Sequence, residues 1–194
     1  MSTHATPPGL LRRDLLLAAC AAALAGCASP ETESTPGARR RTIDAAVDHA
    51  LSALYSQANG ARDLSNRAHG ILVFPSVVSA GLVVAGSHGH GALRKAGTSV
   101  AYYSVAEASV GLLAGAQSKA VYLFFMTPQA LEQFESSAGW TAGVNASVVV
   151  ADLSSGARTA TQFAQQGIIV FIHSNIGLMA GLSLDGTKIS RMAL

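Results

Sequence analysis

The segment GLVVAGSHGHGALRK, residues 81–95, combines strand-forming apolar residues with two histidines and with the glycines Gly86, Gly89 and Gly91. Isolated glycines weaken a strand, so a regular set of them indicates bulges, strong curvature or the close approach of another backbone segment. Glycine recurs in the apolar runs around this segment, at positions 111, 115, 177 and 181. A strongly curved, barrel-like sheet is the simplest structure that uses them all.

The other strands are predicted from runs rich in valine, isoleucine and aromatic residues, broken by glycine and serine. These runs are residues 71–74 (before Pro75), 77–86, 101–116, 120–126, 146–151, 167–172 and 177–184. Asp185-Gly186, which follows the last run, is typical of a type I′ hairpin turn. The pattern predicts long antiparallel sheets.

Three helices are expected beside the sheet. Helical spacing of apolar residues predicts the first, over 42–57, with Thr42 as its N-cap and Asn59-Gly60 at its end. The apolar residues that carry this spacing are Ile43, Val47, Ala50, Leu51 and Leu54. A short helix is expected at 61–68, and Thr127-Pro128 as N-cap and first residue predicts one over about 127–136. The fold class is therefore α+β and rich in strands, with a curved barrel-like antiparallel sheet.

The N-terminus reads as an export signal. Arg12-Arg13 precede the apolar run 15–27, which is shorter than the roughly 20 residues that span a bilayer. The run ends in Leu24-Ala25-Gly26-Cys27, which resembles a bacterial lipobox. This predicts a signal peptide over 1–26, a lipidated Cys27 with a flexible tether over 27–40, and one domain over 41–194. The alternative interpretation of this segment is an N-terminal membrane anchor. The arginine pair is compatible with export by the twin-arginine pathway as well as by the general secretory pathway.

Composition excludes several classes of protein. Cys20 leaves with the signal and Cys27 carries lipid, so no thiol remains for a disulfide or a thiolate metal site. Charged residues are 12% of the chain and the net charge is +2, so no strong field attracts nucleic acid. Arg39-Arg40-Arg41 is read either as a solvated charge run or as a small basic patch near lipid headgroups.

A family resemblance emerges from the order of the glycine and aromatic motifs. The chain has Gly70-Ile-Leu-Val-Phe-Pro75, Gly86-x-x-Gly89-x-Gly91, Tyr102-Tyr103-Ser104, Gly115-Ala-Gln-Ser118, Leu123-Phe-Phe-Met126 and Gly177-Leu-Met-Ala-Gly181-Leu-Ser-Leu-Asp-Gly186-Thr. Over about 65–190 this resembles the SYLF domain. The resemblance implies a non-enzymatic domain that binds anionic phospholipid, with phosphoinositide and actin binding in eukaryotic members and secreted lipoproteins among bacterial ones.

The chain departs from the SYLF pattern in two respects. Family members usually carry an aromatic residue near position 88, where this chain has His88, with His90 two residues on. The actin-binding members carry additional N-terminal or SH3 segments that this chain lacks. Because a bacterial envelope also offers no actin, we expect membrane lipid, and not actin, as the partner.

The segment 81–95 also has features related to nucleotide binding, metal binding and catalysis. Its glycine order is the reverse of a dinucleotide fingerprint and leads into a strand, so nucleotide binding is not expected. His88 and His90 would share a face of an extended strand and could form half of a zinc or copper site, with His69 and His173 as the other histidines available. Ser87 misses the G-x-S-x-G pattern by its first glycine, and no paired carboxylates stand out.

We therefore expect a lipid-anchored, non-enzymatic protein of the bacterial envelope, on the periplasmic face of the outer membrane, without a cofactor. The candidate headgroup contacts are Arg94, Lys95, Lys119, Lys188 and Arg191, although Lys188 and Arg191 differ in parity and would not share a strand face. Gly86, Gly89 and Gly91 are candidates for close backbone approach. The alternatives are a structural or adhesive envelope protein without a small ligand, and a periplasmic metal binder that uses His88 and His90.

Overall fold

The computed structural model describes residues 35–58, 60–81, 84–110, 115–146, 148–150, 167–174, 177–178 and 186–194. Residues 36–194 form one compact unit. Two helices come first, α2 (Pro36–Gln57) and α3 (Ala61–Arg67), followed by four long strands, β1 (Gly70–Gly81), β2 (Val84–Lys95), β3 (Thr98–Val110) and β4 (Gly115–Phe125). The remaining elements are α4 (Pro128–Ser136), β5 (Trp140–Thr141), β6 (Val149–Val150), β7 (Ile168–Ser174), β8 (Gly177–Leu178) and β9 (Lys188–Arg191).

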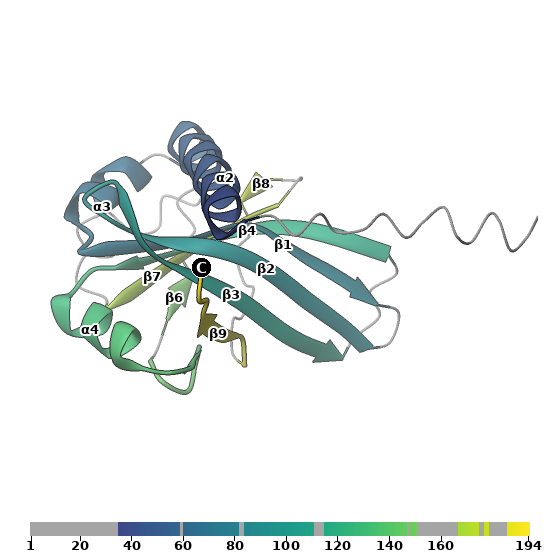
Figure 1. Cartoon of the computed structure of the whole chain (residues 1–194). Coiled ribbons are helices and arrows are strands. Elements are labelled where there is room, and N and C mark those ends of the chain that lie inside the picture. The colour runs from purple at the N-terminus through teal and green to yellow at the C-terminus, as the bar shows by residue number, and fades with distance from the viewer. Residues whose placement is uncertain are drawn as a thin grey trace, which may run out of the picture. The chain divides into compact units, whose positions relative to one another are not determined.

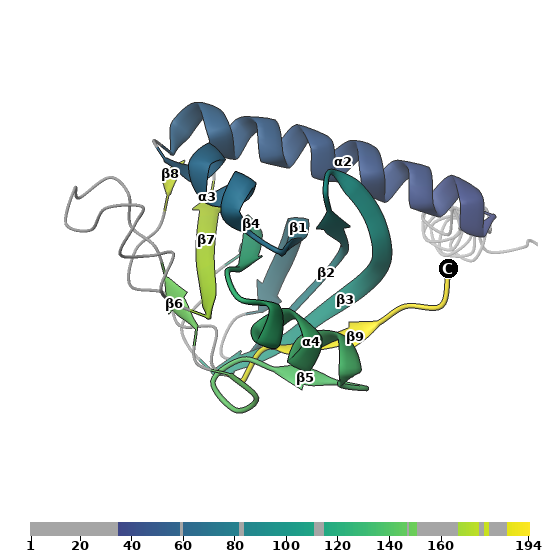
Figure 2. The same cartoon turned by 90° about the vertical axis from the view of Figure 1, so that its left-hand side faces the viewer.

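All these strands belong to one sheet, in the order β5-β9-β3-β2-β1-β4-β7-β6, with β8 paired to β7. Figure 2 shows the sheet curling, with α2 across its outside and α4 on the other side. The expected β-rich α+β fold with a strongly curved sheet is confirmed. The expectation of purely antiparallel pairing is wrong in one place, because β6 runs parallel to β7. The type I′ turn proposed at 185–186 lies partly outside the described residues.

Side chains that point alternately to the two faces of the sheet form two hydrophobic cores. On β1, Leu72 and Phe74 belong to a cluster with Phe134 of α4 and Trp140 of β5, on what we call the inner face. Ile71 and Val73 belong to a cluster with α2, on what we call the outer face. The period of two in a strand places successive side chains on opposite faces, so each central strand contributes to both cores.

Helix α2 starts earlier than the sequence indicated. It begins at Pro36, a residue whose fixed φ suits the first position of a helix, and not at position 42. Thr42 is therefore not an N-cap: it lies inside the helix and its Oγ1 donates to the carbonyl of Ala38 at 3.1 Å. The predicted apolar stripe is nevertheless present, because Ile43, Val47, Ala50 and Leu54 are all buried. Residues 36–40, assigned to the tether, are helical.

Strand β1 continues through Pro75, where the sequence predicted a strand end. The register toward β2 shifts between Val73 and Ser76, and the register toward β4 shifts between Phe74 and Val77. Proline cannot donate to a sheet ladder, so a bulge is where a strand tolerates it. Figure 1 shows the consequence: β1 and β2 form long ribbons that reach beyond α2.

The helix α4 forms as its capping signal predicted. Thr127 is the N-cap, and its side chain accepts a hydrogen bond from the backbone N–H of Ala130 at 3.3 Å, with Pro128 next to it. Leu131 and Phe134 are the buried residues of this helix and complete the inner core. None of the described helices is both long enough and apolar enough to span a bilayer.

Candidate functional site

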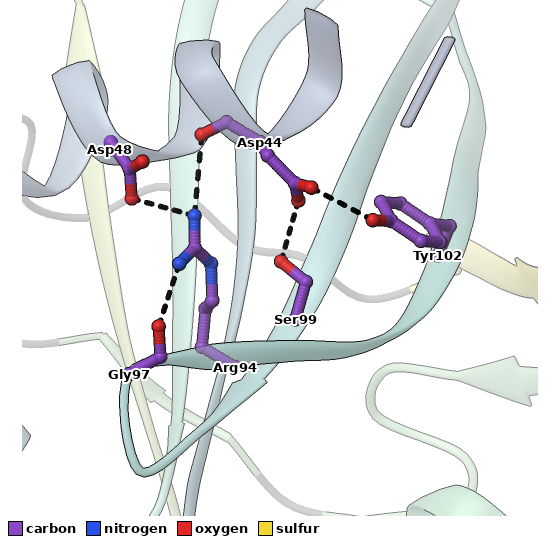
Figure 3. A network of polar contacts seen from close by, with 6 residues as sticks. All are labelled: Asp44, Asp48, Arg94, Gly97, Ser99 and Tyr102. Atoms are coloured by element: carbon purple, nitrogen blue, oxygen red, sulfur yellow. Dashed lines mark hydrogen bonds and ion pairs between the residues drawn. The ribbon is translucent and has the colours of Figure 1, made fainter. Parts of the chain in front are cut away.

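Arg94 ties α2 to the turn between β2 and β3. Its Nη2 donates to the Asp48 carboxylate at 2.6 Å and to the Asp44 carbonyl at 3.2 Å, and its Nη1 donates to the Gly97 carbonyl at 2.7 Å (Figure 3). Its side chain is only 12% exposed. The structure therefore places this candidate headgroup contact in an internal network.

The carboxylate of Asp44 completes that network. It accepts from the Ser99 hydroxyl at 2.6 Å and from the Tyr102 hydroxyl at 2.9 Å (Figure 3). Burial and the hydrogen bond to Asp44 raise the pKa of Tyr102, because both disfavour the phenolate. The start of β3 is thus fastened to the middle of α2 by neutral hydroxyls as well as by Arg94.

Two more of the candidate cations have acidic partners. Lys95 donates to Glu135 of α4 at 2.7 Å, and Lys119 donates to Glu107 at 3.4 Å. The second pair joins β4 to β3, which are separated in the sheet by β1 and β2, so it crosses the inner face of the curve. Both lysine side chains contribute first to the domain's own structure.

Lys188 and Arg191 remain exposed on β9. Lys188 stands opposite Ala106 of β3 and Arg191 stands opposite Tyr103. Tyr103 belongs to the inner core, so the two cations point to opposite faces of the sheet. The five candidate cations are therefore not brought together into one patch.

The histidine pair lies on the outer face beside the start of α2. The Nε2 atoms of His88 and His90 are 3.2 Å apart, and their rings meet edge to face with centroids 4.6 Å apart. Nη2 of Arg39 lies 3.3 Å from Nε2 of His90. Partial burial, and then the neighbouring His88 and Arg39, lower the pKa of His90. Among the described residues, no group of three or more potential metal ligands comes together.

The three glycines of the segment 81–95 do not behave alike. A Cβ on Gly91 would overlap the Val73 carbonyl oxygen and lie 2.7 Å from Cδ1 of Phe74, and a Cβ on Gly89 would lie 2.6 Å from the Ser76 carbonyl oxygen. A Cβ on Gly86 would meet nothing within 4 Å. Close backbone approach thus occurs at Gly89 and Gly91, against the bulge in β1, and not at Gly86.

The arginines at the start of α2 form a basic turn and are not among the five candidate headgroup contacts. Arg39, Arg40 and Arg41 are all exposed, and in the part of the chain that the structure describes none of them forms an ion pair. From the sequence these arginines were expected ahead of the helix, either as a solvated charge run or as a small basic patch near lipid headgroups. The signal for their place inside the helix is Pro36, a favoured first residue of a helix.

A groove of about 840 Å³ lies between α2, α3 and the ends of β1 and β2. Its polar lining includes Arg62, whose guanidinium stacks 4.7 Å above the Tyr55 ring, and Ser65, whose hydroxyl lies 2.6 Å from the Tyr55 hydroxyl. The sequence did not predict this groove, because it exists only once α2 and α3 pack against the start of β1 and the end of β2. Asp48 and Arg94 of the network described above also line it.

Comparison with known families identifies the C-terminal half of this architecture. Residues 106–193 match the family model described as Ysc84: Las17-binding protein actin regulator. The matched segment lies largely within the region, about residues 65–190, whose motifs resemble the SYLF domain. The family expected from the sequence is thereby confirmed. The matched part of the Ysc84 domain begins within β3, so Arg39, His88 and His90 precede it. No curated protein matches the chain.

Proposed function

We propose that the chain is a lipid-anchored protein of a bacterial cell envelope, on the periplasmic face of the outer membrane, whose domain binds anionic phospholipid. The Ysc84 (SYLF) family is known for binding lipid and actin. The Leu24-Ala25-Gly26-Cys27 sequence supports lipidation of Cys27, and Ala28 after it favours sorting to the outer membrane. These observations favour the membrane lipid as the partner.

The basic start of α2 is the observation that carries the proposal. Helix α2 begins at Pro36, so residues 28–35 connect it to Cys27 and can span at most about 30 Å. The exposed Arg39, Arg40 and Arg41 are therefore held within reach of the headgroups. Each such cation contributes roughly 1 kcal/mol of attraction to an anionic surface. Arg94, Lys95 and Lys119 instead form ion pairs inside the domain.

The neighbourhood of Ser87 favours a binding role over hydrolysis. Its hydroxyl lies 2.7 Å from the Ser79 hydroxyl, and the side chain is buried. His88 and His90 point to the opposite face of β2, because side chains alternate along a strand. The sheet itself thus separates the serine from the two histidines that could activate it.

The test is vesicle binding by the chain from Ala28 onward, since Pro36–Leu194 is a compact unit by itself. We expect stronger binding to phosphatidylglycerol vesicles than to phosphatidylcholine vesicles, and a weaker preference at physiological salt than at low salt. The Arg40→Gln/Arg41→Gln variant should lose about tenfold or more in affinity. The matched control is Arg62→Gln/Arg67→Gln, which removes the same charge from α3.

Equal binding of the wild-type chain to both kinds of vesicle would overturn the proposal. Equal losses in the two double variants would also contradict it, because attraction would then follow total charge and not the start of α2. The melting temperature of each variant checks that the comparison concerns folded protein.

A further inference from the structure

We propose that Arg39, His88 and His90 form a binding site for a phosphodiester group, and that this site binds more tightly as the pH falls. The inference rests on the proposed function to the extent that a lipid headgroup is one source of that group. A small soluble phosphodiester is the other source, and it allows the site to be tested without a membrane.

The three side chains bring nitrogen atoms that can donate hydrogen bonds together around Nε2 of His90. His88 and His90 come from alternate positions of β2 and present Nε2 atoms 3.2 Å apart. Arg39 reaches the same point from α2, with Nη2 3.3 Å from Nε2 of His90. The side chain of His88 is exposed and that of His90 is half-buried, so a ligand can reach both from solvent.

When both histidines are neutral, Nε2 of His90 can be the acceptor for both Arg39 and His88. A neutral His90 has a single ring lone pair on Nε2 when its other nitrogen carries the proton, and that lone pair faces both the Arg39 guanidinium and the His88 ring. When both rings are protonated, Arg39, His88 and His90 are all donors and no acceptor remains among them. A phosphodiester oxygen anion supplies the missing acceptor, through charge-assisted hydrogen bonds.

No acidic side chain faces the cluster from the described elements that pack against it. In the register, His90 lies between Ser76 of β1 and Ser104 of β3, and His88 lies between Val78 and Ala106. Beyond Ala106 the next residue on this row is Lys188 of β9, a further cation. The carboxylates in the vicinity are engaged elsewhere: Glu107 with Lys119 on the inner face, and Asp44 and Asp48 with Ser99, Tyr102 and Arg94.

The sign of the pH dependence follows from these charges. Burial of His90, and then the positive charges of His88 and Arg39, lower the pKa of His90. A bound anion offsets that repulsion and raises the pKa of His90, so binding takes up protons. By linkage, affinity then rises as pH falls through the range in which histidine titrates. A phosphodiester keeps one negative charge across this range, so the histidines are the groups that change.

A metal ion is the competing ligand for the same atoms, and it predicts the opposite behaviour. Two Nε2 atoms 3.2 Å apart could share one zinc ion, but zinc needs neutral histidines, so its affinity would fall as pH falls. The guanidinium of Arg39 beside His90 also opposes a second cation. The pH dependence therefore separates the two ligands.

The experiment has two arms, both with the chain from Ala28 onward. In the first, NMR follows the imidazole resonances at pH 5.5 and 7.5 while dimethyl phosphate is added. We expect dimethyl phosphate to shift the resonances of His88 and His90 and to raise the pKa of His90. In the second arm, binding to phosphatidylglycerol vesicles should be about tenfold tighter at pH 5.5 than at pH 7.5.

The variants assign the effect to the cluster. In His88→Gln/His90→Gln the ratio of the affinities at the two pH values should fall below about twofold. The matched control is His69→Gln, an exposed histidine immediately before β1, which should keep the full difference between the two pH values. Both positions of the double variant are at least partly solvated, and an unchanged melting temperature verifies its fold.

The outcomes separate this inference from the proposed function. If dimethyl phosphate shifts no imidazole resonance, or if the double variant keeps the pH dependence, the phosphodiester site is wrong. If zinc shifts these resonances and dimethyl phosphate does not, the cluster is a metal site and the inference is overturned. If dimethyl phosphate binds at His88 and His90 while anionic vesicles are not preferred at either pH, the site stands and the proposed function fails.

Discussion

Replacement of Gly91 by alanine tests the packing of β2 against the bulge in β1. The added Cβ would overlap the carbonyl oxygen of Val73 and would lie 2.8 Å from its carbonyl carbon. These atoms belong to the backbone of a central strand and cannot rotate away as a side chain could. The bulge must therefore move, or β2 must separate from it.

The magnitude follows from what the new methyl group meets. Overpacking of a dense core costs 1–3 kcal/mol in general, and contact with backbone favours the upper end, about 3 kcal/mol for Gly91→Ala. Gly89→Ala should cost less, about 1–2 kcal/mol, because its nearest contact is a single carbonyl oxygen at 2.6 Å. Gly86→Ala faces open space and should change the stability by less than about 0.5 kcal/mol.

Thermal unfolding of the three variants, followed by circular dichroism, checks this ranking. For a domain of this size about 3 kcal/mol corresponds to a fall in Tm of roughly 6–12 °C. Gly86→Ala serves as the matched control, since it adds the same methyl group to the same strand. Equal melting temperatures for Gly86→Ala and Gly91→Ala would refute the reasoning.

Three further changes have outcomes that the structure sets. Arg94→Ala should lower the free energy of unfolding by about 2–3 kcal/mol. Arg94→Lys should recover less than half of this loss, because one ammonium group cannot reach both Asp48 and the Gly97 carbonyl. Denaturant titration measures the stability of both variants. Burial, and then Tyr55, raise the pKa of Tyr122 to about 12. The contribution of this shift to the free energy of unfolding should therefore be complete below about pH 10 and disappear as the pH approaches 12. In Tyr122→Phe the loss of stability at alkaline pH should be smaller, and equal dependence of stability on pH in the two proteins would contradict the assignment. Cys27→Ser should abolish incorporation of labelled fatty acid and leave unprocessed precursor, and labelling that persists would rule out the lipobox.

The parts of the fold that the sequence predicted are those with a local signal. Helix α4 has an N-cap and a proline within its first residues, and the buried stripe of α2 has a clear helical period. The start of α2 was missed because its first turns are charged and exposed, so no apolar period marks them. The continuation of β1 past Pro75 depends on a bulge that both neighbouring strands must accommodate, which no short window of sequence reveals.

The candidate site was harder to predict, because the roles of its cations depend on distant partners. Asp48 and Arg94 are 46 residues apart in sequence, yet their contact removes Arg94 from the set of solvent-exposed cations. Lys119 and Glu107 meet because the sheet curves, and the pairing of strands alone would keep them apart. The shared face of His88 and His90 was predictable, since it requires only an extended strand.

The bulge in β1 and the glycines of β2 also restrict the register in which these two strands can pair. Phe74 and Pro75 together stand opposite Gly91, and only a residue without a side chain fits beneath that doubled stretch of chain. A slip of one residue would bring His90 or Ala92 under the bulge and would turn the apolar residues of β2 to the wrong face. The mispaired hairpin is therefore disfavoured on steric grounds. The same steric restriction would apply if β1 and β2 paired between two chains, so a domain-swapped dimer would have to form the native register.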